Sequence, residues 1–458
     1  MRNQHAGLWI WICVLPLAFD FKAPDAQTSH AAQWLVVFPA LGAAIALIMI
    51  GPRFAHPVPL RRFVACALLL SVGGSIVAQM LQGNDVGNYL RVLLPFLLFA
   101  VGFSVACRPW QPVRIAQIEN AMWYANVLCL VFTFVFGLAV GGSLHDVRYR
   151  IVSPTMLGLQ AVLLHQFIVA RRFSVTTVLV FLATLVVELL SVTRSLMVAT
   201  ALLALFATWI ASPTLRHLLR AGVRLMGALL CIAAIAGVGA WVAPDVASHW
   251  TQRVFAAKET AANRDPTTIT RLAEMRDQYD QVTSSASTLL FGEGYGHEYR
   301  YSPVYLPDLE GQISEKDFYA IHDWTAGHNF WVYQLFAGGL VFGIGMPLAM
   351  LGALMKVGFA CRRWRRLMSR ESRDPMLGPF GRAVMLLAAM PATSIGGNPL
   401  GARFSGLIYG IALGLAVGLY AQLRYRLEMQ RRQHAGPSFH HRPMPAAPLN
   451  PFAPMEPR

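Results

Sequence analysis

The residues best suited to chemistry are His328 and Asn329, which stand where a long polar segment gives way to an apolar run. A neutral imidazole near pH 7 accepts a proton from a hydroxyl group, so His328 is a candidate general base. The competing interpretation is that an isolated histidine at a helix start only packs or caps. His322 and Asp323 lie close by, but the sequence has neither an HExxH motif nor a paired-cysteine spacing, so we predict no metal site.

Arginines at the ends of apolar runs, on the side that carries few other cations, form a second candidate group. They are Arg91, Arg148, Arg150, Arg194 and Arg403, together with Arg271 in the long polar segment. Guanidinium groups bind phosphate oxygens in a bidentate manner and stay charged at any physiological pH. Several arginines that converge on one cavity would suit a pyrophosphate, whereas a single arginine at a helix end usually reaches toward water. For Arg91 and Arg403 we favour the second interpretation.

Arg194 is the strongest candidate among these arginines because of its position. The apolar run 174–211 is too long for one membrane crossing, and Arg194 falls near its middle. An arginine at the centre of a bilayer is costly, so we split the run into two helices with Arg194 at the turn. Glu188 precedes it by about one and a half helical turns. We expect Glu188 to form a structural ion pair with one of the arginines rather than to act in catalysis.

A glycine-rich motif, GEGYG at 292–296, lies in the polar segment ahead of His328. Glycine lets the backbone approach a ligand closely, so we expect Gly294 to line the substrate site together with Asn329. The motif is not a dinucleotide-binding fingerprint, because no strand–helix frame surrounds it.

The elements that must position these residues are membrane helices. Of the 458 residues, 55% are hydrophobic and only 13% are charged, about half the charged fraction of a soluble protein. We therefore predict an all-α polytopic membrane protein with about 12 transmembrane helices. The predicted helices are 7–21, 31–51, 63–81, 88–106, 118–140, 151–170, 174–192, 194–211, 222–242, 328–356, 379–396 and 403–423.

The distribution of charge predicts the orientation of these helices. Most of the net charge of +15 lies in short loops on one side, as the positive-inside rule expects of cytoplasmic loops, so it does not indicate nucleic-acid binding. With both termini cytoplasmic, we divide the chain into four parts. These are a bundle of about nine helices (1–242), a large periplasmic loop (243–327), about three further helices (328–432) and a disordered cytoplasmic tail (433–458). Within the loop, residues 267–282 have helical periodicity.

Three motifs in this order resemble the O-antigen ligase and polysaccharide polymerase superfamily of bacterial inner-membrane glycosyltransferases. They are SVTRSLMVA, then TRLAEMRDQY with LLFGEGYG, and last GHNFWVYQLFAGGLVFGIG. The likeness covers most of the chain, is most specific from Arg148 to Gly345, and maps the family pattern onto Arg194, Arg271 and His328. One departure is Ser153-Pro154-Thr155, where the family often has a stretch like Asn-Pro-Asn. The resemblance implies a GT-C-like fold.

The activity that the resemblance implies is inverting, metal-independent transfer of glycan from undecaprenyl pyrophosphate at the periplasmic face, without a cofactor. The arginines would hold the donor pyrophosphate, with Arg148 and Arg150 contributing, and His328 would activate the acceptor hydroxyl. The acceptor is another lipid-linked glycan in a polymerase, which we slightly favour, or lipid A core or protein in a ligase. Other polysaccharide-assembly proteins are expected partners. A lipid-linked glycan flippase is the alternative of a different class, disfavoured because we find no inverted repeat.

Overall fold

The computed structural model of the protein describes residues 5–20, 30–139, 147, 150–191, 193–212, isolated positions between 214 and 248, and residues 266–311, 313–367 and 374–434. Within these residues the secondary structure is helical, apart from a single bridge between Tyr299 and Asp323. The all-α prediction is therefore confirmed for the described part of the chain. Arg148, most of the predicted helix 222–242 and the tail beyond residue 434 lie outside it.

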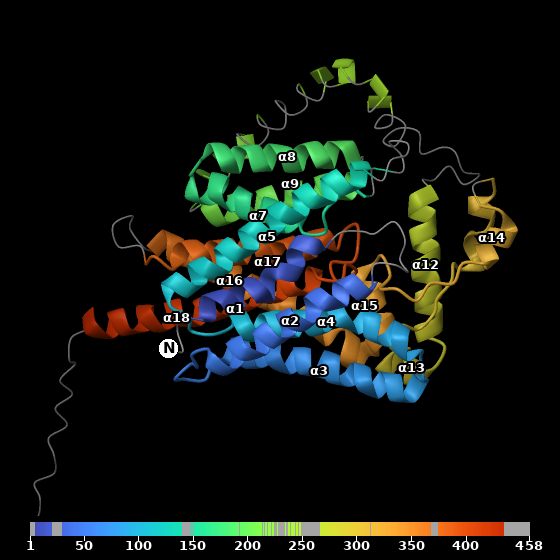
Figure 1. The fold of residues 1–458 in the computed structure, drawn as a ribbon, viewed down its shortest axis with the longest axis horizontal. Coiled ribbons are helices and arrows are strands. Elements are labelled where there is room, and N and C mark those ends of the chain that lie inside the picture. The colour runs from blue at the N-terminus through green and yellow to red at the C-terminus, as the bar shows by residue number, and fades with distance from the viewer. Residues whose placement is uncertain are drawn as a thin grey trace, which may run out of the picture.

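Most of the helices of the first half lie close to their predicted positions (Figure 1). They are α1 (Ala6–Val14), continued by η1 (Leu15–Phe19), then α2 (His30–Ile50), α3 (Pro59–Gln82), α4 (Val86–Ala106), α5 (Pro112–Ala139), α7 (Met156–Leu164), η2 (His165–Ala170), α8 (Val175–Ser191) and α9 (Arg194–Ala211). The start of α9 at Arg194 confirms the predicted division of the run 174–211 into two helices.

The second half contains a polar helical region and then four long or bent apolar helices. Its elements are α12 (Pro266–Val282), α13 (Ala286–Phe291), η3 (Pro303–Tyr305), η4 (Pro307–Leu309), α14 (Glu315–Tyr319), α15 (Phe330–Gly338), η5 (Gly339–Gly343), α16 (Gly345–Leu367), α17 (Leu377–Thr393) and α18 (Ser405–His434). The helix predicted at 267–282 is confirmed as α12.

The single helix predicted over 328–356 is wrong, because the structure breaks it into α15 and α16 with a bend of 85°. The π-helical turn η5 separates the two helices. Glycines cause the break: Gly339 has a φ of +60°, and Gly343 packs against the carbonyl of Gln334 with no room for a side chain. His328 is consequently at the start of a short helix that ends within a few turns.

Among the described residues, five helices are long and apolar enough to cross a membrane, or six if the bent pair α15–α16 is one span. The five are α3, α4, α5, α9 and the Ser405–Gln430 part of α18. Four further apolar helices are shorter: Ala6–Phe19, Leu35–Ile50, Met156–Ala170 and Val175–Ser191. These helices are compatible with a membrane protein, whereas the count of twelve crossings stays a prediction.

The centre of the bundle is the pair α4 and α18, whose backbones touch. Glycines spaced four residues apart on α18 face successive carbonyls of α4: Gly406 faces that of Pro95, Gly410 that of Phe99 and Gly414 that of Phe103. Small residues at this spacing let two membrane helices pack at close range. Because both residue numbers rise together along the contact, α4 and α18 run in the same direction.

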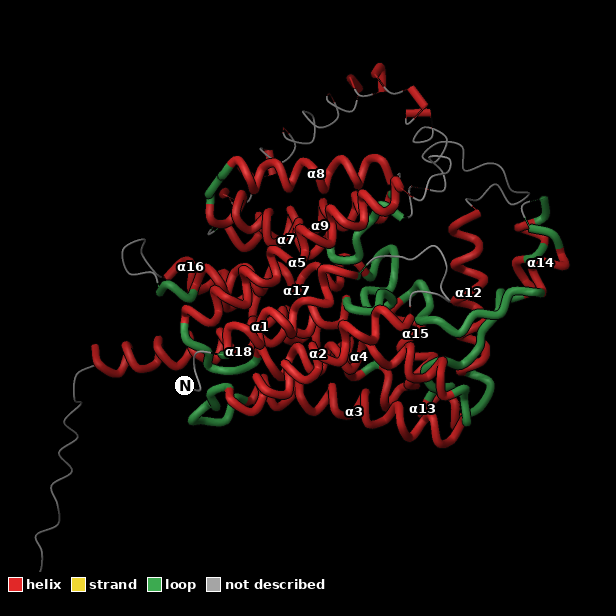
Figure 2. The backbone as a smooth tube through the Cα atoms, viewed as in Figure 1, coloured by secondary structure: helices red, strands yellow, loops and turns green. Residues whose placement is uncertain are grey.

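The polar helical region covers one end of the bundle. In Figure 1, α12, α13 and α14 gather at the right, whereas the last turns of α18 project beyond the opposite end, near the N-terminus. Figure 2 shows that loops join α12 and α14 to the ends of the bundle helices there. The Nε2 atom of Gln82, at the end of α3, donates to the carbonyl of Gly292 at 3.1 Å. The starts of α4 and α18 are therefore at the end that carries α12.

Candidate functional site

The centre of the site is a pair formed by His328 and Glu274. The Nδ1 atom of His328 lies 2.7 Å from Oε2 of Glu274, and the backbone N–H of His328 donates to Oε1 at 2.7 Å. A carboxylate only accepts hydrogen bonds, so Nδ1 carries a ring proton, and in the neutral imidazole the lone pair is then on Nε2. The side chain of Glu274 is 3% exposed and that of His328 is 54% exposed. The carboxylate is thus buried behind an imidazole that is open to a substrate.

The residues on either side of His328 hold it in this position. A Cβ atom at Gly327 would lie 2.5 Å from Oε1 of Glu274, so only glycine lets the chain approach the carboxylate this closely. On the other side, the Oδ1 atom of Asn329 accepts from the N–H groups of Trp331 and Val332 at 3.0 and 3.1 Å. Asn329 therefore caps α15 and determines where the helix begins, in addition to the substrate contact predicted for it.

Helix α12, which carries Glu274, is itself anchored to the segment that follows it. The Oδ2 atom of Asp277 accepts from the backbone N–H of Arg300 at 2.8 Å and from Nε2 of Gln281 at 2.8 Å. The N–H of Ser302 donates to the carbonyl of Ala273 at 3.0 Å. These bonds hold α12 against residues 300–302, so the face of the helix that carries Glu274 keeps its orientation.

Arg271 lies one turn before Glu274 on the same face of α12. Its Nη1 atom is buried and has no hydrogen-bond acceptor within the described residues. Burial raises the pKa of Tyr301, Glu274 and Asp323 add to the rise, and the charge of Arg271 opposes it. Arg271 therefore acts electrostatically on the surroundings of Glu274, and its guanidinium has an unused donor.

The loop between α17 and α18, residues 394–404, connects the His328 region to Arg194. The Nδ2 atom of Asn398 donates to the carbonyl of Gly327 at 3.1 Å. In the same loop, Gly396 packs directly against Ser195, in the first turn of α9. Arg194, the first residue of α9, has an exposed side chain. One loop thus contacts both the residue before His328 and the residue after Arg194.

Two arginines that we interpreted as solvent-reaching also lie beside this loop. Arg403 belongs to it, and its Nη1 atom is buried without an acceptor among the described residues. The guanidinium of Arg91 lies 5.5 Å from the ring centre of Trp324, four residues before His328, in a cation–π contact. Arg91 is also close enough for its charge to act on Arg403. The starts of α4 and α18 therefore bring two more cations to the segment that leads into His328.

The structure does not bring all the predicted substrate residues to this place. Arg150 lies in the turn before α7, where its backbone packs against Gly137 near the end of α5. Gly294 packs against Asn84 in the loop between α3 and α4, since a Cβ atom there would lie 2.5 Å from Nδ2 of Asn84. Gly294 thus braces the loop between α3 and α4, and its contact with the substrate stays a prediction.

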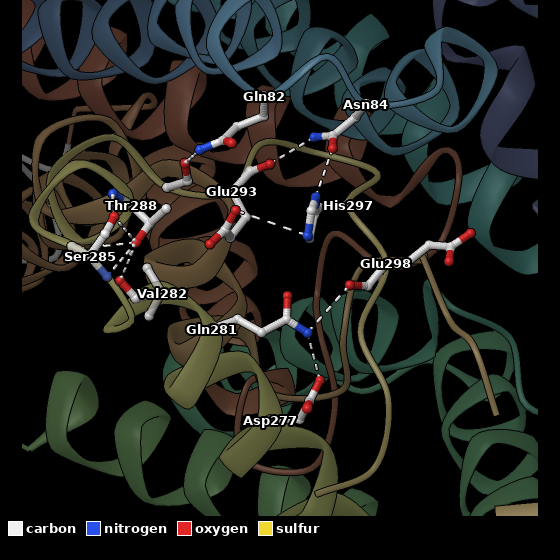
Figure 3. A network of polar contacts seen from close by, with 11 residues as sticks. Gln82, Asn84, Asp277, Gln281, Val282, Ser285, Thr288, Glu293, His297 and Glu298 are labelled. Carbon is white, nitrogen blue, oxygen red and sulfur yellow. Dashed lines mark hydrogen bonds and ion pairs between the residues drawn. The ribbon is translucent and has the colours of Figure 1, made fainter. Parts of the chain in front are cut away.

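The polar network around the glycine motif explains this bracing role (Figure 3). The Nδ2 atom of Asn84 donates to the carbonyl of Glu293 at 2.7 Å, and its Oδ1 atom lies 2.7 Å from Nδ1 of His297. Three glycines of the motif have a positive φ: 80° at Gly292, 86° at Gly294 and 78° at Gly296. The backbone needs these angles to thread between α3 and α15.

The ion pair predicted for Glu188 is not formed with any described arginine. Its Oε2 atom accepts from Nε2 of Gln160 at 2.9 Å, and both of its oxygens lie 3.2 Å from Oγ1 of Thr200. Glu188 faces α7 and α9 inside the bundle, whereas Arg194 is exposed at the start of α9. A pair with Arg148, which lies outside the described residues, stays a prediction.

Sequence reasoning did not find Glu274, the partner of His328. Glu274 was in view, three residues after Arg271 in the motif TRLAEMRDQY. The available signal was its position: Glu274 is an acidic residue one turn from the candidate Arg271, in the same polar segment that precedes His328. Among the described residues, no group of three or more His, Cys, Asp or Glu could hold a metal ion.

Comparison with known proteins does not identify a relative. No protein-family model matches the chain, and no curated protein is significantly similar to it in sequence. The geometry of the site is therefore the basis of the functional assignment.

Proposed function

We propose that the protein is a membrane glycosyltransferase that transfers glycan from undecaprenyl pyrophosphate to an acceptor hydroxyl. The observation that carries the proposal is the pair of Glu274 and His328, with Arg271 one turn from Glu274 on α12 and a buried Nη1 atom on it that has no acceptor among the described residues. A buried carboxylate that orients an exposed imidazole is the arrangement of a general base. Buried guanidinium donors without acceptors suit the oxygens of a phosphorylated leaving group.

The reaction follows from these roles. The Nε2 atom of His328 takes the proton of the acceptor hydroxyl, and the oxygen attacks the anomeric carbon of the donor sugar from the side opposite the leaving group. The bond from that carbon to the phosphate oxygen breaks, and its electron pair leaves with the pyrophosphate, so the anomeric configuration inverts. Glu274 stabilises the imidazolium that forms, and Arg271, Arg403 and Arg194 stabilise the departing diphosphate. No step requires a metal or a cofactor.

For the membrane arrangement we propose a multi-pass protein of the bacterial inner membrane with about 12 crossings, cytoplasmic termini and the site at the periplasmic end. The distribution of cations supports this orientation. Arg365 and Arg366 are at the end of α16, and Arg424 and Arg426 are near the end of α18, away from α12. The shorter apolar helices would supply the remaining crossings with tilt or local thinning of the bilayer.

We favour a polymerase of O-antigen or exopolysaccharide repeat units, whose acceptor is a second lipid-linked glycan. The alternative is a ligase that transfers glycan to lipid A core or protein, because the same base and the same leaving group serve both. A flippase is the alternative of a different class. The broken helix α15–α16 is a feature found in transporters, but transport alone does not need an imidazole with a buried carboxylate behind it.

The test is a reconstituted reaction with the full-length protein in lipid vesicles. Undecaprenyl-pyrophosphate-linked repeat units are supplied with and without lipid A core, and the products are separated by size. We expect longer lipid-linked glycans without lipid A core. Product found only on lipid A core would favour the ligase, and movement of the unchanged lipid-linked glycan across the membrane would favour the flippase.

The matched variants are His328→Ala and His322→Ala. His322 is exposed, six residues earlier in the same segment, and among the described residues it pairs with exposed Glu298 at 3.5 Å. We expect His328→Ala to abolish transfer while the protein still inserts and folds, and His322→Ala to retain it. Full activity in His328→Ala would remove the imidazole from the mechanism.

A further inference from the structure

A group of buried polar side chains joins α7, α8 and α9 far from His328 in the sequence. It consists of Gln160 on α7, Thr184 and Glu188 on α8, and Thr200 on α9. Gln160 and Thr184 are 0% exposed and Glu188 is 3% exposed. These helices are in the apolar part of the chain, so the group is a polar island that must satisfy its own hydrogen bonds.

The hydrogens available to this island can be counted. The Oε1 atom of Gln160 is an acceptor and receives the hydroxyl hydrogen of Thr200 at 2.8 Å. The Nε2 atom of Gln160 donates to Oε2 of Glu188 at 2.9 Å and to Oγ1 of Thr184 at 3.2 Å. The hydroxyl of Thr184 donates its hydrogen to the carbonyl of Phe181 at 2.7 Å. The contact of 3.2 Å between Thr200 and Glu188 is then left without a hydrogen.

A proton on Glu188 supplies the missing hydrogen. The carboxyl group then donates to Oγ1 of Thr200, Thr200 donates to Gln160, and Gln160 donates back to the other carboxyl oxygen. The opposite assignment of the Gln160 amide leads to the same result. Its oxygen would then face Oε2 of Glu188 at 2.9 Å, and two oxygens at that distance need a hydrogen between them.

The surroundings of Glu188 agree with a neutral carboxyl group. Besides burial, the described groups that influence the protonation of Glu188 are the side chains of Gln160 and Thr200, which are uncharged and hydrogen-bonded to it. Helices α5 and α7 pack against α8, α9 packs against α7, and α17, which carries Arg382, packs against α7 and α9. Titratable side chains occur on α5, including Glu119, and at Arg194 on α9, but α7 has none. Glu119 is engaged elsewhere, in a two-bond ion pair with Arg382 at 2.7 Å.

We propose that Glu188 is a carboxylic acid that carries its proton at neutral pH and acts as a positioning residue for Arg194. Thr200, which receives its hydrogen bond, is less than two helical turns from Arg194 on α9. Ser191, at the end of α8, donates to the carbonyl of Glu188 at 2.8 Å. The proton therefore joins α8 to α9 through Thr200, across the short turn where Arg194 lies. The role assigned to Arg194 rests on the proposed function, whereas the protonation does not.

The experiment is infrared difference spectroscopy of the full-length protein in lipid at pH 7. Subtraction of the Glu188→Gln spectrum from that of the wild type should leave the carbonyl band of a protonated carboxyl group, which shifts in D₂O. The matched control is Glu119→Gln, which should remove carboxylate bands because Glu119 is ion-paired. Loss of carboxylate bands in Glu188→Gln, from an ionised group or one holding a cation, would overturn the proposal.

Two further measurements test the proposal, and the first of them does not need Glu188→Gln to fold. Thr200→Val removes the acceptor of the proposed proton, so the carboxylic band should move to the frequency of a more weakly bonded group, and an unchanged band would contradict the network. In the transfer assay, Glu188→Leu should raise the KM for the lipid-linked donor at least tenfold, while Glu188→Gln should leave it within about twofold. If the band is present and the wild type transfers no glycan, the proton assignment stands and the proposed function fails.

Discussion

Glu274 and His328 are 54 residues apart in the sequence, yet the carboxylate of Glu274 forms two hydrogen bonds of 2.7 Å with His328. One bond holds the ring and the other holds the backbone beside it. The pair therefore fixes both the tautomer of His328 and the direction in which its Nε2 atom points.

The first prediction concerns this pair. In Glu274→Gln the amide can present a donor to Nδ1, which would leave the ring proton on Nε2, the wrong nitrogen for a base. We expect kcat to fall by about 10²-fold or more, the range of general base catalysis, with a smaller change in KM. Initial rates at varied donor concentration measure this. A kcat equal to that of the wild type, in a variant with an unchanged melting temperature, would mean that Glu274 does not orient the base.

The second prediction concerns the arginines around His328. In Arg271→Lys and Arg194→Lys the charge is kept but the planar pair of donors is lost. A hydrogen bond to a charged group contributes about 1.5–3 kcal/mol, so we expect transfer to fall by about 10-fold to 100-fold in each variant. Arg276→Lys on α12 is the control, because Arg276 is exposed and paired with Asp280 at 2.9 Å. Equal activity in all three would mean that positive charge alone suffices.

The third prediction tests the close approach at Gly327. A methyl group in Gly327→Ala would meet the carboxylate of Glu274 and the amide of Gln278. We expect a loss of about 1–3 kcal/mol in stability, with displacement of His328 and loss of transfer. Gly352→Ala, on α16, has no neighbour within 4 Å of the added Cβ and should be tolerated. Melting temperatures of the two variants in one detergent give the comparison.

The fourth prediction concerns the pH dependence of stability at the brace in Figure 3. Burial lowers the pKa of His297, with Glu298 and Asp277 opposing the shift. As the pH falls below about 6.5, the unfolded chain takes up this proton before the folded chain does, so the free energy of unfolding decreases. Burial raises the pKa of Glu293, which acts in the opposite direction.

Comparison with His297→Gln isolates the histidine. Melting temperatures measured from pH 8 to pH 5 should fall more steeply in the wild type than in this variant. Parallel curves would show that His297 does not titrate differently in the folded and unfolded chains.

The fifth prediction concerns metal ions. The proposed reaction uses arginines for the charge of the leaving group, so EDTA should leave the rate of the purified protein unchanged within about twofold. Strong inhibition that Mg²⁺ or Mn²⁺ reverses would require a metal in the mechanism.

Local features of the chain could be predicted from sequence more readily than contacts between distant segments. The start of α9 at Arg194 and the extent of α12 followed from apolar length, charge and periodicity, which depend on neighbouring residues. The break after α15 did not, because GGLVFG is as apolar as an unbroken span and differs only in what its glycines pack against.

The candidate site was predictable in its residue types but not in its pairings. His328 and Arg271 stand out by their positions in the sequence. The partnership of Glu274 with His328, and the contact of Asn398 with Gly327, depend on how α12 and the loop before α18 fold across the end of the bundle. Gly294 was singled out because glycine lets the backbone approach a ligand closely. In the structure the same property of glycine lets the backbone pack closely against Asn84.

At Gly406, Gly410 and Gly414 the backbone of α18 touches that of α4, with no side chains between them. The two helices therefore cannot slide past each other. Arg91 and Arg403 lie close to the starts of these two helices. The two arginines must therefore move together if the site opens or closes around a lipid. The movable partner would then be the segment that carries His328, whose helix of nine residues ends after about two and a half turns at η5. Opening would thus carry the base away from a stationary pair of cations.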